Sequence, residues 1–210
     1  MTSLSELANG IQVPALDLAA IGESNATKGK DIFAPKERKA WDKSVEARTD
    51  FTFRLKISPR AGMNFVSIWE KSAHGRTLTD IKGDDGEIAH FAESLAPVIQ
   101  QCLGSNLRSS GWCIVVPPCR RHKERNFATL VAEELGKRLD IPFHPAIAEC
   151  SSRERLKAVF SLNYDFPEPN VIVFDDFVTT GSTMAAMKDL LEKIGKTHFI
   201  VAGVNNHARI

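Results

Sequence analysis

Two adjacent acids, Asp175 and Asp176, follow a compact apolar run at residues 171–174. A short segment rich in hydroxyl groups, residues 177–181, comes next, and a helical pattern begins at Thr183. Backbone N–H groups at the start of a helix bind anions, and phosphate is a good match for them. Carboxylates beside such a site can accept hydrogen bonds from the hydroxyl groups of a ribose. The segment therefore predicts a binding site for a phosphorylated sugar.

Three neighbouring motif classes are excluded by the residues present. A Walker A loop needs a lysine before its Ser or Thr, and no lysine lies between Asn170 and Met187. A dinucleotide fingerprint needs three spaced glycines, whereas only Gly181 is present. An aspartyl-phosphate phosphatase would carry a second acid where this chain has Phe177. An ordinary strand, turn and capped helix without a ligand is the remaining structural alternative.

The surrounding sequence predicts strands that alternate with amphipathic helices. Apolar runs without polar alternation are typical of buried parallel strands; they occupy residues 112–116, 171–174 and 197–204. Between them, apolar residues recur at helical spacing, over residues 88–102, 127–139 and 183–194. These patterns predict an α/β fold in which helices cover both faces of a parallel sheet. Ligands bind such sheets at the carboxyl ends of the strands, so we expect the chemistry to follow residues 116 and 174.

Residues 1–50 show no sustained pattern. Residues 51–57 alternate between apolar and polar side chains, which predicts a half-buried strand. Turn-forming residues follow at 58–62, and residues 65–69 can return as a second strand. We therefore predict two parts: an N-terminal extension with a hood-like hairpin over residues 1–80, and a core over residues 81–210.

The composition is that of an ordinary globular protein, with 43% hydrophobic and 25% charged residues. Lys and Arg total 27 against 26 Asp and Glu, and this net charge of +1 argues against a general binder of nucleic acid. No apolar run approaches the roughly 18 residues that cross a bilayer, and no basic segment marks a secretory signal. The four cysteines lack zinc-ribbon spacing, which favours free thiols in a reducing cytoplasm.

Residues 171–183 resemble the binding motif for phosphoribosyl pyrophosphate (PRPP) in type I phosphoribosyltransferases. That motif consists of apolar residues, two acids and a Thr-Thr-Gly-x-Thr loop, and each hallmark position is filled here. The resemblance implies a type I phosphoribosyltransferase-like fold, in which Asp175 and Asp176 hold the ribose 2′- and 3′-hydroxyls. It also implies that the 5′-phosphate is held by Val178, Thr179, Thr180, Gly181, Ser182 and Thr183.

Upstream segments resemble one branch of that class, the ComF-like proteins associated with DNA uptake. Residues 79–84 are similar to its Lys-Phe-x-Gly-Asp segment, and residues 115–121 occupy the place of its Pro-Val-Pro-x-x-Arg turn. Two further runs of the branch resemble residues 125–127 and 154–160, so that the likeness spans about residues 81–204. The chain departs from the branch in lacking its amino-terminal zinc-binding cysteines.

A basic turn at residues 117–123 directly follows the first core strand. Charge runs of this kind are usually solvated surface, which is the structural alternative. Beside a PRPP motif, however, the turn suits pyrophosphate, because the planar fork of arginine binds phosphate oxygens in pairs. The predicted pyrophosphate contacts are Cys119 through its N–H group, Arg120, Arg121 and, before the first core helix, Lys82.

The resemblance implies an enzyme that transfers a phosphoribosyl group from PRPP to a base or small amine and releases pyrophosphate. Mg²⁺ prefers waters and substrate phosphates, so we expect no direct protein ligand and at most a water bridge to Asp175 or Asp176. The alternative is a non-catalytic nucleotide sensor or accessory of DNA uptake that keeps the phosphate site. The expected ligands are PRPP or a nucleoside monophosphate, with no membrane and no direct nucleic-acid ligand, in the cytoplasm; a homodimer stays open.

Overall fold

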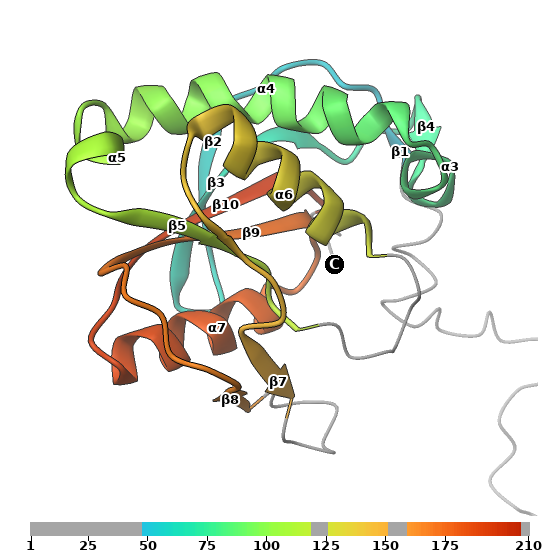
Figure 1. Cartoon of the computed structure of the whole chain (residues 1–210). Helices are drawn as coiled ribbons and strands as arrows, with labels where there is room; N and C mark the ends of the chain where they lie inside the picture. Colours follow the sequence, from blue (N-terminus) through green and yellow to red (C-terminus); the bar gives the residue numbers. More distant parts are fainter. Residues whose placement is uncertain (1–47, 119–125, 151–158, 207–210) are drawn as a thin grey trace, which may run out of the picture. The chain divides into compact units, whose positions relative to one another are not determined.

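The computed structural model describes residues 48–118, 126–150 and 159–206 (Figure 1). All of them belong to the second of the chain's two units, which are Met1–Glu37 and Arg38–Ile210. The boundary expected at residue 80 therefore lies inside the second unit. What was expected of residues 1–47 lies outside the described part of the chain.

A six-stranded sheet forms the centre of the described residues, in the order β2-β3-β10-β9-β5-β6. The strands from β3 to β6 in this order all run parallel, whereas the edge strand β2 is antiparallel to β3. The two central strands, β9 and β10, pair along their whole length, from Asn170 opposite Thr197 to Val178 opposite Asn205. The strands are β2 (Lys56–Arg60), β3 (Met63–Glu70), β5 (Trp112–Val115), β6 (Phe143–His144), β9 (Asn170–Val178) and β10 (Thr197–Asn205).

The predicted helices form close to their expected positions. The longest continues through Pro97, and a short helix that the pattern did not predict follows it. The first helix was also not predicted, and it contains Lys82; it begins with a capping box, in which Thr77 and Asp80 each accept a backbone N–H from the other. The helices are α3 (Leu78–Gly83), α4 (Gly86–Leu103), α5 (Asn106–Ser109), α6 (Phe127–Leu139) and α7 (Ser182–Lys193).

Helices cover both faces of the sheet, which confirms the predicted α/β architecture. In Figure 1, α4 and α6 lie on one face and α7 lies on the other. Alternate residues of β9 serve the two cores: Ile172 and Phe174 pack towards α4 and α6, and Val171 and Val173 pack towards α7. This double burial is the reason why residues 171–174 carry no polar alternation.

The β2–β3 hairpin is shifted along the sequence from its predicted position. Residues 58–60, expected in the turn, belong to β2, and the chain reverses at Ala61 and Gly62, whose φ angles are 50° and 76°. The alternation at residues 51–57 does not mark a half-buried strand, since Leu55 and Ile57 are exposed. The buried strand is β3, which the sequence predicted only in part.

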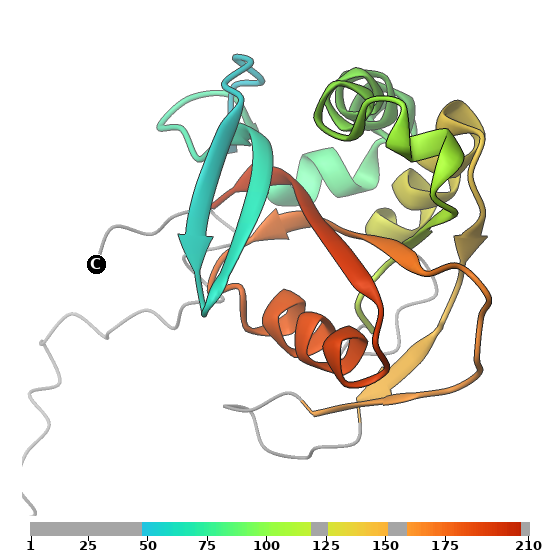
Figure 2. The ribbon, with the colours of Figure 1, turned by 90° about the vertical axis from the view of Figure 1, so that its left-hand side faces the viewer.

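The tip of this hairpin leaves the main sheet. β3 pairs with β10 from Val66, opposite Val201, onward. Residues 63–65 of β3 come before this register and do not pair with β10. Figure 2 shows the hairpin crossing the sheet steeply, with its tip close to the start of α7. The hairpin is therefore part of the sheet at one end and a separate arm at the other.

Short strands complete the described unit. The weak strand predicted at residues 141–148 is divided between β6, in the main sheet, and β7 (Ala148–Cys150), which pairs antiparallel with β8 (Phe160–Leu162). A second small pair is formed by β1 (Arg48–Thr49) and β4 (Arg76–Thr77). None of the helices described here has the length and apolar content that crossing a membrane requires.

Candidate functional site

The direction of strand addition reverses between β5 and β9. From β5 the chain passes through α6 to β6 on one side, whereas from β9 it passes through α7 to β10 on the other. The two strands are adjacent and parallel, with Val115 opposite Val173. A crevice outside the carboxyl ends of strands at such a point is the usual ligand site of an open α/β sheet. The two places that the sequence singled out are thus neighbours in the fold.

The loop after β9 is shorter than predicted. The strand continues through both acids to Val178, so the loop comprises residues 179–181 and α7 starts at Ser182. Val178 is 1% exposed, and its carbonyl accepts the N–H of Asn206. Val178, which was predicted to contact the 5′-phosphate, is therefore the last residue of β9, and its side chain is buried.

Gly181 gives the loop its shape. Its φ of 77° lies in the left-handed region, which a residue with a Cβ adopts only under strain. A Cβ added there would lie 3.0 Å from Met63 Cε and 3.2 Å from Arg60 Cγ, both on the hairpin. Glycine is needed at this position for its backbone conformation and for the close approach of the hairpin.

Hydroxyl groups gather at the start of α7. Thr180 Oγ1 and Ser182 Oγ lie 3.1 Å apart, and the N–H of Ser182 donates to Thr180 Oγ1 at 3.4 Å. Thr183 follows in the first turn and is half-buried. The positive end of a 12-residue helix and these hydroxyls face the same loop, which is the arrangement that favours an anion.

The hairpin holds this loop from outside. Arg60 Nη1 donates to the carbonyl oxygen of Thr179 at 2.8 Å and to that of Val178 at 3.3 Å. Burial lowers the pKa of the Arg60 guanidinium from its ordinary value. From β10, Asn206 Nδ2 donates to Thr179 Oγ1 at 3.3 Å. The sequence analysis missed both residues: Arg60 stood in a turn signal, and Asn206 follows the polar end of an apolar strand.

Asp176 is the more deeply buried of the two acids, with 4% of its surface exposed. Its Oδ1 accepts the N–H of Phe177 at 2.8 Å, and its Oδ2 lies 2.5 Å from Lys82 Nζ. The lysine also lies over the ring of Phe177, 5.3 Å from the centroid. The structure thus brings Lys82, predicted as a pyrophosphate contact, directly onto one of the two predicted ribose contacts.

Asp175 occupies the adjacent position and is partly accessible. Removal of its carboxyl from water raises its pKa well above the ordinary value, and the charge of Asp176 raises it further, while Lys82 acts in the opposite direction. A carboxyl with a raised pKa gains from hydrogen-bond donors that arrive with a ligand. Within the described residues, the lysine contact is made by Asp176 and not by Asp175.

The remaining predicted contacts stay predictions. Cys119, Arg120 and Arg121 lie outside the described residues. The segment that leads to them is described: Val116 is half-buried, Pro117 is buried, and both follow β5 at the switch point. Because β5 and β9 are adjacent and parallel, residues 116–118 and the loop of residues 179–181 follow neighbouring strands.

The residues at the carboxyl end of β9 do not form a cluster of metal ligands among the described residues. Within the described part of the chain, the group of side chains spaced to hold a metal ion lies elsewhere, at Cys113, His144 and Glu168. At β9, one oxygen of Asp176 is already in contact with the Lys82 ammonium. The acids therefore fit a Mg²⁺ ion that arrives with substrate phosphates and keeps its waters better than one held in a protein cage.

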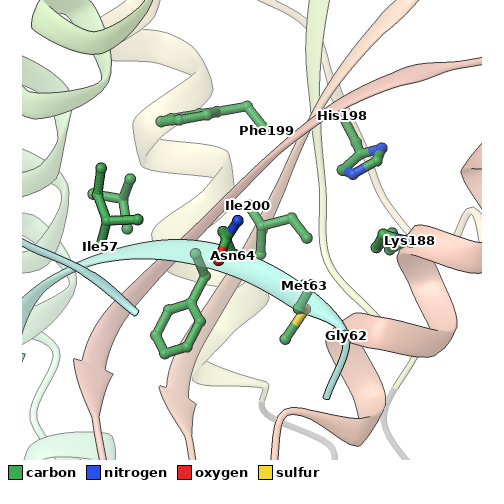
Figure 3. A pocket seen from close by; sticks show the side chains of 10 residues that line it. Ile57, Gly62, Met63, Asn64, Lys188, His198, Phe199 and Ile200 are labelled. Atoms are coloured by element: carbon green, nitrogen blue, oxygen red, sulfur yellow. The ribbon is translucent and has the colours of Figure 1, made fainter. Parts of the chain in front are cut away.

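A cavity of about 350 Å³ lies beside the part of the hairpin that does not pair with β10 (Figure 3). It opens where β3 and β10 separate, and Met63, Ile200, His198 and Lys188 line it. Burial lowers the pKa of His198. The cavity is of the size that small ligands occupy, but its residues come from the β2–β3 hairpin, the amino end of β10 and α7, and none of them from the loop of residues 179–181.

Comparisons with known proteins give structural similarity alone. No family model matches the chain, and no curated protein matches its sequence. The chain is similar in structure to orotate phosphoribosyltransferase from Aeropyrum pernix, with 20% identity, coverage of 62% of this chain and 66% of that one, and a TM-score of 0.41.

Two further solved structures show the same degree of similarity. For adenine phosphoribosyltransferase from Saccharomyces cerevisiae, identity is 17%, coverage is 72% of this chain and 92% of that one, and the TM-score is 0.42. For Helicobacter pylori xanthine-guanine-hypoxanthine phosphoribosyltransferase the values are 15%, 57%, 72% and 0.40. Similarity at this level does not define a family.

Proposed function

We propose that this chain binds PRPP and transfers its phosphoribosyl group to a base or small amine, with release of pyrophosphate. One observation carries the proposal: a glycine-shaped loop at a helix N-terminus and a pair of acids follow the same buried strand, at the point where strand order reverses. A phosphate and a ribose from one molecule match that combination. The chain would be a type I phosphoribosyltransferase, with the ComF-like branch as the finer assignment.

Each group has a role in this proposal. The loop of residues 179–181 and the start of α7 bind the 5′-phosphate, and Asp175 accepts a hydrogen bond from a ribose hydroxyl. Asp176 reaches the other hydroxyl only if Lys82 moves aside. Lys82 would then be released towards the negative charge of pyrophosphate, so that its observed contact with Asp176 is exchanged for its predicted contact with pyrophosphate.

The reaction breaks the bond between ribose C1 and pyrophosphate, so positive charge develops on the sugar and negative charge on the leaving group. Arg120, Arg121 and the N–H groups from Cys119 onward would stabilise the leaving group. Mg²⁺, when bound with PRPP, supplies further charge neutralisation on the phosphates. The chain's own acids would meet it through water, at Asp175.

The Lys82–Asp176 contact also favours a second candidate. If Lys82 stays in place, Asp176 remains neutralised, and the site binds a nucleoside monophosphate through the loop and Asp175 without turnover. The protein would then be a nucleotide-binding sensor or an accessory of DNA uptake. In either case we propose a cytoplasmic protein that acts without a membrane or direct nucleic-acid ligand, alone or as a homodimer.

Pyrophosphate release separates the two candidates. Incubation of the full chain with PRPP, Mg²⁺ and a panel of purines, pyrimidines and small amines should release pyrophosphate with at least one acceptor. Binding of PRPP by calorimetry without release for any acceptor would support the sensor. Absence of both binding and release would refute both candidates.

Gly181→Val should abolish PRPP binding, because the new side chain meets Met63 and Arg60 and strains the backbone. Gly195→Val is the matched control: its φ of 71° is also left-handed, but nothing lies within 4 Å of an added Cβ. The control should carry the same backbone strain and keep its affinity. Equal losses in the two variants would mean that general destabilisation explains the result.

A further inference from the structure

A second group of chemically active side chains lies apart from the phosphate loop. Cys113 of β5, His144 of β6 and Glu168, just before β9, offer ligand atoms that all lie within 4.8 Å of one another. Cys113 stands opposite Val171, at the amino end of β9, whereas the loop follows Val178. At about 3.3 Å per residue, the two places are roughly 20 Å apart along the strand.

The fold assembles these residues from separate segments. β5 and β6 are neighbours, with Val115 opposite His144, and β9 pairs with β5 on the other side. Cys113 is fully buried and belongs to the core beneath α7, whereas the side chains of His144 and Glu168 are 21% and 15% exposed. The group is thus closed on the thiol side and reachable by solvent on the other.

The three donors form a set that suits a borderline cation. A thiolate, an imidazole nitrogen and a carboxylate oxygen are the ligands of zinc sites, and three protein ligands leave the fourth tetrahedral position for water. Ligand atoms around tetrahedral zinc lie about 3.3–3.8 Å apart, given bond lengths of about 2.0–2.3 Å. Ligand atoms that now lie within 4.8 Å of one another need to approach by about 1.5 Å at most.

Charge and hydrogen bonding agree with such a site. His144 Nε2 lies 2.8 Å from Glu168 Oε2, so the imidazole and the carboxylate already face each other. Burial and, to a lesser extent, the charge of Glu168 together raise the pKa of the Cys113 thiol to about 12, while Lys196 acts in the opposite direction. Lys196 is itself held by the carbonyl oxygen of Phe166 at 2.8 Å. A divalent cation would balance the charge of one thiolate and one carboxylate.

We propose that Cys113, His144 and Glu168 bind one Zn²⁺ ion, with water as the fourth ligand. The thiol proton passes to solvent when the metal binds. The bound ion links β5, β6 and the segment that enters β9, and so stabilises the half of the sheet opposite the phosphate loop. This site is independent of the function proposed above.

Metal binding tests the proposal on the full chain. After removal of metal with a chelator and dialysis against Zn²⁺, we expect one zinc per chain by elemental analysis and a higher melting temperature. Replacement by Co²⁺ should give the charge-transfer band of a cobalt–thiolate bond. No uptake of metal, or uptake without a thiolate band, would overturn the proposal.

Variants locate the ligand. Cys113→Ser should lose the thiolate band, whereas Cys102→Ser, at an exposed cysteine of α4, should keep it. If Cys113→Ser fails to fold, His144→Gln and Glu168→Gln at the solvent side should each weaken zinc binding by at least ~tenfold while folding normally. A band that survives in Cys113→Ser, or that is lost in a Cys119→Ser, His122→Ala variant, would place the metal elsewhere and refute the site.

Discussion

The two ends of β9 hold carboxylates in different ways. At the carboxyl end, Asp176 is in contact with the ammonium group of Lys82. At the amino end, Glu168 faces His144, whose imidazole is charged only when it is protonated. The first arrangement carries its own counter-charge and suits an exchange with an incoming ligand. The second can supply neutral and anionic donors together, which is what a metal cation needs.

The largest effect should come from breaking the fixed pair at the carboxyl end. Lys82→Met should lower the free energy of unfolding by about 2–3 kcal/mol, because Asp176 is left buried without its cation. Fully buried pairs lose about 3–5 kcal/mol, and the 35% exposure of the Lys82 side chain reduces the loss. Urea denaturation at neutral pH measures it. The double variant with Asp176→Asn should recover most of the stability.

Lys137→Met is the matched control for this change. Lys137 pairs with Glu133 on the surface of α6 and is 64% exposed, so its loss should leave the midpoint of denaturation unchanged. If Lys82→Met behaved like Lys137→Met, the Lys82–Asp176 contact would carry no stability, and the contrast between the two ends of β9 would fail.

A smaller effect is expected from the contact between the hairpin and the loop. Arg60→Met removes hydrogen bonds to the carbonyls of Thr179 and Val178, and the loosened loop should bind a nucleoside monophosphate about tenfold more weakly. Arg54→Met, at an exposed position before β2, is the control and should bind normally. Calorimetry with both variants checks the expectation, and equal affinities would show that the loop needs no support from the hairpin.

A further effect concerns the pH dependence of stability. Because the pKa of Asp175 in the folded chain is raised above its ordinary value of 3.8, its protonated form is favoured by folding. The contribution of the protonated Asp175 carboxyl to the free energy of unfolding is complete below pH 3.8. This contribution is lost as the pH rises through the raised pKa. Asp175→Asn removes this loss, so the variant should gain stability over the wild type from about pH 4 upward. Thermal melts across the pH range measure the difference, and a constant offset would contradict it.

The basic turn offers a comparison of ligands at one end of the sheet. Arg120→Ala combined with Arg121→Ala should weaken PRPP binding by roughly one to two decades and leave the binding of a nucleoside monophosphate nearly unchanged. Only PRPP carries the pyrophosphate that the arginines are proposed to contact. Equal losses for both ligands would assign the arginines to the general field of the site.

The sequence predicted the parts of the fold that depend on local pattern. Residues 171–174 are buried on both faces and could be recognised as a central strand, and Gly181 marked the turn that its left-handed φ requires. The hairpin register could not be predicted, because the exposed Leu55 and Ile57 alternate just as buried residues do. The end of β9 was predicted too early, because the apolar run stops at Phe174 whereas the strand continues through both acids to Val178.

Contacts between distant segments were beyond any local pattern. Lys82 was singled out for its charge, yet its position on Asp176 depends on how α3 packs against β9. Arg60 and Thr179 are 119 residues apart in the sequence, and their hydrogen bond exists only because the hairpin tip leaves the sheet. The same holds for Cys113, His144 and Glu168, whose spacing along the chain resembles no metal motif.

The hydrogen bonds of Arg60 connect the rim of the sheet to the loop that binds the anion. Linkage is reciprocal: if the hairpin steadies the loop, then an occupied loop steadies the hairpin. Local opening of β2 and β3 must therefore become rarer when phosphate is bound. The amide hydrogens of β2 and β3 will therefore exchange more slowly with solvent in the presence of ligand, and slower exchange at this edge of the sheet reports an occupied loop.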